Sequence, residues 1–219
     1  MDTPLTQPPA PVLENCLVLY EKLDLAVFPI AGMDPELPDE LRALAAKMPD
    51  RLWMLRLANR SRWWRHWMRR RLQNHNLGVC TGRRFNLLVL DFDFHKGAPA
   101  VTSIPDLPPT LTVKTAFGIH LYYRLPKNAP PIPSTHNVFA QGVDVRGEFS
   151  YVTAPPSIHA SGALYRFEDP AVEMAVVPDS VIQRLRSCEV NRFFYLRKFH
   201  RNYFNIQRRV TSARRQCHS

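Results

Sequence analysis

Two aspartates, Asp91 and Asp93, stand at the end of the most hydrophobic stretch of the sequence, residues 86–92. Side chains two residues apart on a β-strand point to the same face of a sheet, so the two carboxylates are expected to project together. Two like charges at the end of a buried strand repel each other and are costly to desolvate, and binding of Mg²⁺ or Mn²⁺ relieves that cost. The alternative is a solvated strand end whose acids cap the next turn, and the Asp-x-Asp pattern alone does not choose between the two.

A third acidic residue, Asp144, lies in another strand-like segment, residues 142–146. An acid between two valines on a short strand is unusual unless something pairs with it. One interpretation is a local salt bridge, for which we expect Arg146 to be available only across a turn. The other is a third oxygen ligand, which completes a site for two metal ions together with Asp91 and Asp93.

His120 begins a further predicted strand and follows Gly118 by two residues. A glycine at this point permits close approach of the backbone to a ligand, and an imidazole can form a hydrogen bond with a phosphate oxygen. A lone histidine on a strand is more often structural, so the residue alone leaves both roles open.

The elements that must position these residues are indicated by the spacing of apolar positions and by turn residues. We predict helices at residues 12–23, 34–48, 61–73 and from Asp179 onward, and strands at residues 26–30, 77–80, 86–92, 111–114, 120–125, 142–146, 150–154 and 163–167. Segments 111–114 and 120–125 are expected to pair as a hairpin. The predicted fold class is α+β, with helices before and after a largely antiparallel or mixed sheet.

Composition excludes several classes of protein. The chain has 219 residues, 45% of them hydrophobic, which is ample for a folded core and excludes global disorder. No run of about twenty apolar residues exists and the first residues do not resemble a signal peptide, so we expect a cytoplasmic protein without a membrane partner. The four cysteines are too scattered for a disulfide framework or a Cys-x-x-Cys site.

The positive charge is concentrated in two segments. The formal net charge is +10, residues 60–71 contain six arginines and no acid, and residues 184–219 contain ten basic residues and one acid. Such segments beside a nearly neutral body are typical of a protein that holds a polyanion. Solvated helix faces are the alternative. The candidate nucleic-acid contacts are Arg62, Arg65, Arg69, Arg70, Arg71, Arg197, Lys198 and Arg201.

Seven sequence blocks occur in an order that resembles a known family. The blocks are AVFPI (26–30), NLGVCTG (76–82), LVLDFD (88–93), GIHLYYR (118–124), GVDVRG (142–147), YVTAPPSIH (151–159) and GALY (162–165). Together they resemble the N-terminal domain of bifunctional primase–polymerases, of the archaeo-eukaryotic primase superfamily, which are common on plasmids, phages and integrated elements. The resemblance covers about residues 12–185.

The resemblance implies a fold and roles for the residues above. The fold is an RRM-like catalytic sheet joined to a smaller α/β subdomain, with the active site in the cleft between them. Asp91 and Asp93 occupy the first motif, His120 the motif whose histidine contacts the incoming triphosphate, and Asp144 the third motif, so these four are the implied catalytic residues. The sequence departs from the family pattern at residues 32–35, where a lysine is missing, and at Phe117, where a small residue is usual.

The expected function is template-directed nucleotidyl transfer, as DNA primase and polymerase, in the replication of a plasmid, phage or other mobile element. It uses a single-stranded DNA template, deoxyribo- or ribonucleoside triphosphates, and two Mg²⁺ or Mn²⁺ ions. A helicase or replication initiator acting in trans is an open partner. The alternatives are a metal-dependent nuclease or phosphodiesterase, and a non-catalytic module that binds single strands.

We expect a flexible leader at residues 1–11, the catalytic domain at residues 12–185 and a basic helical tail at residues 186–219. Ser157 and His159 are placed at the rim of the cleft, with a purely structural turn as an equal alternative. The expected nucleotide-binding residues are His120, Arg146, Lys114, Ser157 and His159.

Overall fold

The computed structural model describes residues 10–31, 75–137 and 139–187. The helices predicted at 34–48 and 61–73 lie outside these ranges, as do all eight candidate nucleic-acid contacts and the tail from residue 188. The other predicted elements are present, with ends that differ by a few residues.

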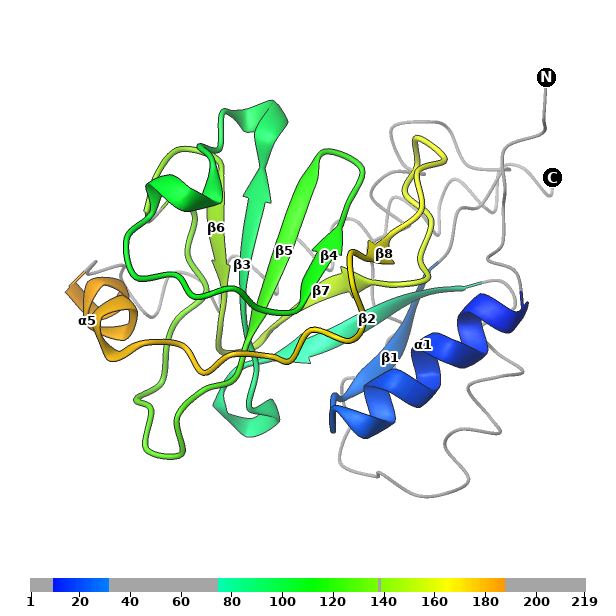
Figure 1. Cartoon of the computed structure of the whole chain (residues 1–219), viewed down its shortest axis with the longest axis horizontal. Helices are drawn as coiled ribbons and strands as arrows, with labels where there is room; N and C mark the ends of the chain where they lie inside the picture. The colour runs from blue at the N-terminus through cyan, green and yellow to red at the C-terminus, as the bar shows by residue number, and fades with distance from the viewer. Residues whose placement is uncertain (1–9, 32–74, 138, 188–219) are drawn as a thin grey trace, which may run out of the picture.

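A five-stranded antiparallel sheet forms the larger part of the described chain (Figure 1). Its central strand, β3 (Leu88–Asp93), lies between β5 (Gly118–Tyr123) and β6 (Val143–Arg146). On the far side of β5 follow β4 (Thr112–Lys114) and the short β8 (Arg166–Phe167), so the strand order is β6-β3-β5-β4-β8. The predicted hairpin is confirmed as the pair of β4 and β5.

A second sheet has three antiparallel strands in the order β1-β2-β7. They are β1 (Val27–Ala31), β2 (His75–Thr81) and β7 (Ser150–Ala154). Short 3-10 helices follow β2 and β3, namely η2 (Arg83–Phe85) and η3 (Phe94–Lys96), and a third, η4 (Val101–Ser103), lies before β4. The described strands therefore form two antiparallel sheets, whereas the sequence predicted one antiparallel or mixed sheet.

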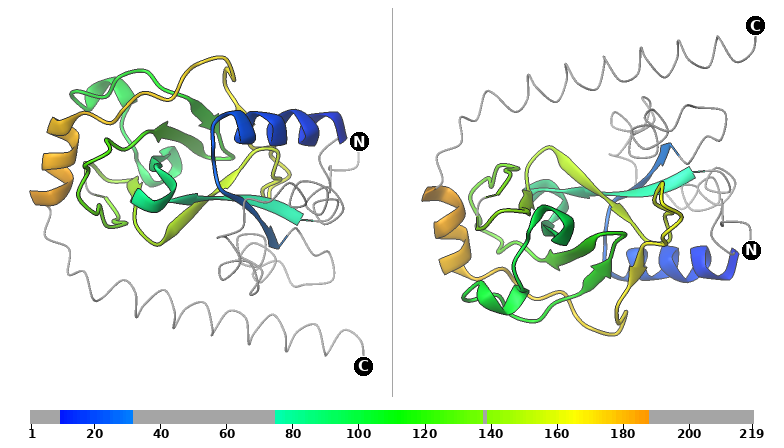
Figure 2. Two further views of the ribbon diagram at one scale, coloured as in Figure 1. Left: turned by 90° about the horizontal axis from the view of Figure 1, so that it is seen from below. Right: turned by 90° about the horizontal axis from the view of Figure 1, so that it is seen from above.

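Two α-helices lie at opposite ends of the described part of the chain (Figures 1 and 2). Helix α1 (Ala10–Lys22) begins two residues before the predicted helix, and α5 (Asp179–Ser187) begins at the predicted residue. The Tyr20 hydroxyl of α1 donates a hydrogen bond of 2.7 Å to the Pro155 carbonyl and so ties the helix to the segment after β7. No described helix is long and apolar enough to cross a membrane.

The five-stranded sheet has an apolar layer on each face, because alternate residues of β3 point in opposite directions. On one face Val89 packs in a cluster with α1 and with residues of β1, β2 and β7. On the other face Leu88, Leu90 and Phe92 pack in a cluster with Val181 and Leu185 of α5. The α+β class is confirmed, and the RRM-like and smaller subdomains remain a prediction.

Candidate active site

The acidic residues lie on the same face of the five-stranded sheet as Val89, which packs in a cluster with residues of the three-stranded sheet. In the register of the strands, Asp91 of β3 is directly opposite His120 of β5 on one side and Asp144 of β6 on the other. Directly opposed residues of antiparallel strands share a face and lie close together. Three residues that are far apart in the sequence therefore form one row across three adjacent strands.

Arg146 joins the two carboxylates of this row. Its Nη2 atom lies 3.0 Å from Asp91 Oδ2 and 3.0 Å from Asp144 Oδ2, so the two oxygens are within two hydrogen-bond lengths of each other. The prediction that Arg146 could reach Asp144 only across a turn is wrong. Residues 144 and 146 are two apart on one strand, so their side chains share a face.

The charge state of Asp91 follows from these contacts. Burial by itself would raise the pKa of this carboxyl, but the charge and hydrogen bond of His120 and then those of Arg146 hold the pKa well below its usual range. The carboxylate is therefore ionised at neutral pH and is available as an oxygen ligand.

Asp144 has two further partners that the sequence did not indicate. His136 Nδ1 lies 2.7 Å from Asp144 Oδ2, and the backbone N–H of Asn137 donates to Asp144 Oδ1 at 3.4 Å. The segment before β6 is brought alongside it by the bridge between Thr135 and Val145. No spacing rule predicts this contact, because the loop between residues 137 and 143 sets it.

Asp93 lies two residues beyond Asp91 and forms an ion pair with Lys96 of η3, with 2.6 Å between Nζ and Oδ2. The hydrogen bond that the Lys96 ammonium donates to Asp93 raises the pKa of Lys96 above its usual value, although burial opposes it, and the charges of Asp93, Asp144 and Asp91 add to the effect. All three carboxylates thus act on one ammonium group. The other oxygen of Asp93, Oδ1, is buried and has no hydrogen-bond partner among the described residues.

His120 is buried against Asp91, with 7% of its side chain exposed. Its Nε2 atom lies 3.4 Å from Asp91 Oδ1, while Nδ1 is buried without a hydrogen-bond partner in the part of the chain that the structure describes. The rings of Tyr122 and Tyr165 lie 6.5 and 6.1 Å from the imidazole, centre to centre. The imidazole is therefore fixed beside the carboxylate row.

Gly118 is required for a reason that differs from the predicted one. A Cβ atom at this position would lie 1.7 Å from the carbonyl oxygen of Phe92 on the neighbouring strand. The close approach is thus between two strands, and it lets β5 run beside β3 up to Asp93, with which Gly118 pairs.

The structure does not bring Lys114 to the carboxylates. Lys114 pairs with Ile119, and Val113 pairs with His120, so Lys114 points to the opposite face of the sheet. Its Nζ atom forms an ion pair of 2.8 Å with Glu168.

Ser157 and His159 differ in their surroundings. Ser157 is buried, accepts a 2.7 Å hydrogen bond from the Leu77 N–H and lies 3.2 Å from the Leu77 carbonyl, which favours the structural alternative. His159 is half-buried, and its ring lies 5.1 Å from that of Phe117 and 6.4 Å from that of Tyr165, which in turn contacts His120. His159 is therefore at the edge of the site.

The residues fit divalent cations in kind, because carboxylate oxygens are the ligands that Mg²⁺ and Mn²⁺ prefer and one buried Asp93 oxygen has no partner. In the arrangement described, however, no three His, Cys, Asp or Glu side chains within the described ranges are grouped closely enough to hold a metal ion. Arg146 and Lys96 supply the positive charge beside the acids instead.

The fold and the site place the chain among α+β domains that present acidic and basic side chains together on one face of an antiparallel sheet. The particular family follows from comparison: the model of the bifunctional DNA primase/polymerase N-terminal domain matches residues 17–180, and the chain belongs to this family. The resemblance inferred from the sequence is thereby confirmed. No curated protein matches the chain.

At the level of the family, the activity is that of a DNA primase/polymerase, a nucleotidyltransferase that acts on a DNA template and nucleotides. The matched residues include Asp91, Asp93, His120 and Asp144.

Proposed function

We propose that this domain is a template-directed DNA primase and polymerase whose reaction takes place at the row formed by His120, Asp91 and Asp144. The observation that carries the proposal is the register that aligns these residues across β5, β3 and β6 in a chain of the primase/polymerase family. Two like charges that are directly opposed on adjacent strands destabilise a sheet, so the placement of Asp91 opposite Asp144 is typical of a site that binds cations.

Asp91, Asp93 and Asp144 are the residues that would hold two divalent cations, Mg²⁺ or Mn²⁺. When bound, such ions lower the pKa of an attacking 3′-hydroxyl and neutralise a leaving pyrophosphate. The low pKa of Asp91 supports this role, because an ionised carboxylate needs no proton loss before it binds a cation.

Arg146 lies between two acids and is the residue at the row best placed to bind phosphate. Guanidinium groups bind phosphate as well as carboxylate, with two parallel hydrogen bonds in each case. With 28% of its side chain exposed, Arg146 can turn toward the triphosphate of a nucleotide bound at the row. We assign it the binding of phosphate oxygens and the stabilisation of charge that develops during transfer.

His120 orients the row and keeps Asp91 ionised through its Nε2 contact. Its unpaired Nδ1 is a second polar atom that a phosphate oxygen can satisfy. His159, beside Phe117, is proposed to line the edge of the nucleotide site.

The wider assignments rest on the sequence and on the family. We propose the catalytic domain at residues 12–185, template contacts from the arginines of residues 62–71 and from the basic tail, and a role in replicating a mobile element. A helicase or initiator acting in trans remains a hypothesis.

Primer synthesis on single-stranded circular DNA tests the proposal. The protein is incubated with Mg²⁺ or Mn²⁺ and labelled ribo- or deoxyribonucleotides. The variants Asp91→Asn and Asp144→Asn are assayed in parallel, with Asp106→Asn as the matched control because Asp106 is an exposed aspartate outside the site. We expect synthesis by the parent and the control and none by the other two.

Two other outcomes would replace the proposal. Release of mononucleotides from DNA without added triphosphates identifies a nuclease. DNA binding without synthesis by the parent, unchanged in Asp91→Asn, identifies a non-catalytic binding module.

A further inference from the structure

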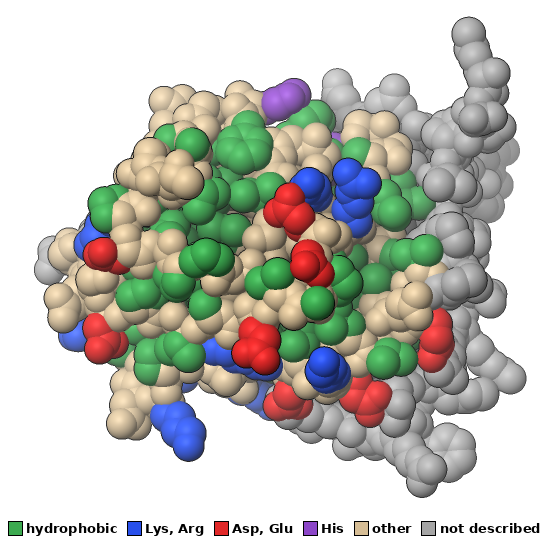
Figure 3. All heavy atoms as spheres, in the orientation of Figure 1, with side chains coloured by type: hydrophobic (Ala, Val, Ile, Leu, Met, Phe, Trp, Pro, Cys, Tyr) green, Lys and Arg blue, Asp and Glu red, His purple; other side chains and the backbone are tan. Residues whose placement is uncertain are grey.

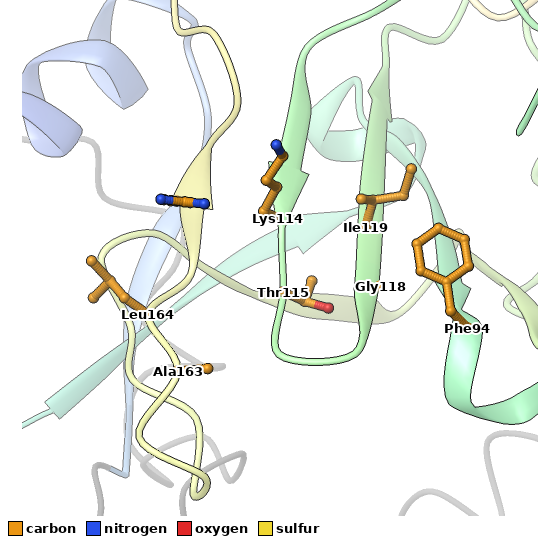
Figure 4. Close-up of a pocket in the computed structure, with 8 residues that line it drawn as sticks. Phe94, Lys114, Thr115, Gly118, Ile119, Ala163 and Leu164 are labelled. Atoms are coloured by element: carbon orange, nitrogen blue, oxygen red, sulfur yellow. The ribbon is translucent and has the colours of Figure 1, made fainter. Parts of the chain in front are cut away.

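A hollow of about 480 Å³ lies on the five-stranded sheet over the β4–β5 hairpin (Figure 4). Ala163 and Leu164, from the segment before β8, lie on one side of it, and Phe94 and Ile119 lie on the other. Lys114 rises between them. The volume is in the range of sites for small organic ligands.

This hollow is separate from the carboxylate row. Lys114 and Ile119 are paired in the register, as are Lys114 and Arg166, and these residues alternate with Val113 and His120. They therefore point to the face opposite to that of His120. Figure 3 shows basic and acidic side chains close together among apolar ones over this part of the sheet.

Two cations border the hollow. Lys114 is paired with Glu168, but both side chains are about half exposed, and an ion pair of this kind is weak in water. Among the described residues no carboxylate pairs with Arg166, which is exposed. An anionic ligand can therefore bind Arg166, which has no carboxylate partner among the described residues, and can replace Glu168 as the partner of Lys114.

The walls are apolar and include an exposed aromatic ring. Phe94 is 47% exposed although it follows directly on a buried strand, and Ile119 and Leu164 are half-buried beside the cations. An aromatic ring that lines the same hollow as two cations suits a ligand that carries both a flat apolar part and phosphate, which is the composition of a nucleotide.

We propose that this hollow binds a nucleotide unit of the single-stranded template, with its base against Phe94 and its phosphates on Lys114 and Arg166. The inference rests on the proposed function for the identity of the strand. Gly118, which lines the hollow, pairs with Asp93 and lies two residues before His120, so the hollow begins at the end of β5 that is nearest the row. A strand that rounds the β4–β5 turn passes from one face to the other.

The test measures the binding of a labelled single-stranded oligonucleotide to the full chain over a series of salt concentrations. The double variant Lys114→Ala, Arg166→Ala is compared with Lys127→Ala, Arg186→Ala, which loses the same charge from two exposed residues away from the hollow. We expect the slope of log K against log salt to fall by about 1.4 in the first variant, since each phosphate contact of a single strand contributes about 0.7. An equal change in both double variants would overturn the proposal.

Two further variants act in different ways. Glu168→Gln frees Lys114 and is expected to tighten DNA binding at least about 2-fold, whereas Glu173→Gln, an exposed control, is not. Phe94→Ala is expected to weaken binding between about 5-fold and 100-fold with an unchanged salt slope, because it removes a stacking contact and no charge. Unchanged affinity in both would contradict the assignment.

A kinetic readout distinguishes the strand from a free nucleotide. In primer synthesis, the Lys114 and Arg166 variant should need more template for half-maximal rate while the KM for nucleotides stays the same. A raised nucleotide KM with unchanged oligonucleotide binding would show instead that the hollow holds the incoming triphosphate. Because the binding experiment needs no synthesis, it decides on the hollow even if the chain proves not to be a polymerase.

Discussion

Two polar clusters in this chain are built in opposite ways. The cluster around Ser157 consists of neutral groups that form hydrogen bonds with one another. The Ser157 hydroxyl accepts a hydrogen bond from the Leu77 N–H and lies 3.2 Å from the Leu77 carbonyl oxygen. The Asn76 side-chain amide forms two hydrogen bonds, of 2.8 and 2.9 Å, with the backbone of Ile158. These contacts fasten the segment after β7 to β2.

The row formed by His120, Asp91 and Asp144 is charged, and some buried polar atoms in it or beside it make no hydrogen bond to a described residue. Asp91 and Asp144 share one guanidinium nitrogen, and Asp93 Oδ1 and His120 Nδ1 are buried with no partner within the described ranges. Buried polar groups in folded proteins are nearly always satisfied, and each exception needs an explanation. We infer that the neutral cluster serves stability, and that the charged row is held ready for ligands.

The largest expected effect is on synthesis by Asp91→Asn. Loss of a charged oxygen ligand removes several kcal/mol of transition-state stabilisation, so incorporation should fall on the order of 1000-fold. Because the pKa of Asp91 is held low, its charged form also stabilises the fold, so the unfolding free energy measured in urea should fall as well, and rates are compared per folded molecule. Synthesis per folded molecule near that of the parent would contradict the assignment of Asp91 to the reaction.

Ser157→Ala should affect stability and not synthesis. It leaves the buried Leu77 N–H without its 2.7 Å acceptor, which costs about 1–3 kcal/mol of unfolding free energy. Synthesis per folded molecule should remain near that of the parent. A variant of full stability with a large loss in rate would place Ser157 in nucleotide binding, as first expected from the sequence.

Arg146→Ala should give a smaller loss than Asp91→Asn, about 10-fold to 100-fold in kcat/KM for nucleotides. Arg146→Lys keeps the charge but not the paired hydrogen bonds and should recover only part of the loss. Full activity of both variants would show that the guanidinium only neutralises the two acids.

The smallest effect is expected for His136→Ala. The imidazole is half exposed and its contact with Asp144 contributes less than about 1 kcal/mol, so synthesis should stay within about 5-fold of the parent. A loss as large as that of Asp144→Asn would mean that His136 itself binds substrate.

The strands and the order of the site residues could be predicted from the sequence, because both depend on local spacing. The apolar run before Asp91, the turn signal at residues 116–118 and the shared face of strand residues two apart are all short-range signals. The expected geometry of Arg146 was wrong, because residues 144 and 146 are two apart on one strand and their side chains therefore lie on the same face of the sheet.

The remaining features depend on contacts between distant segments. The face on which Lys114 lies is set by the register of the β4–β5 hairpin, and a shift of one residue would have placed it beside His120. Likewise, the burial of Ser157 requires β2 to pass beside it, and the contact of His136 requires the loop before β6 to fold back. No single-sequence pattern carries that information.

Binding of Mn²⁺, followed by the loss of its free-ion paramagnetic resonance signal, shows whether the acids of β3 and β6 form one cation site. We expect the parent and Asp106→Asn to bind the ion in the presence of a nucleoside triphosphate, and Asp91→Asn and Asp144→Asn each to lose the protein-dependent part of this binding. Unchanged binding in Asp144→Asn would contradict the account, because the acids of β3 and β6 would then not serve one site.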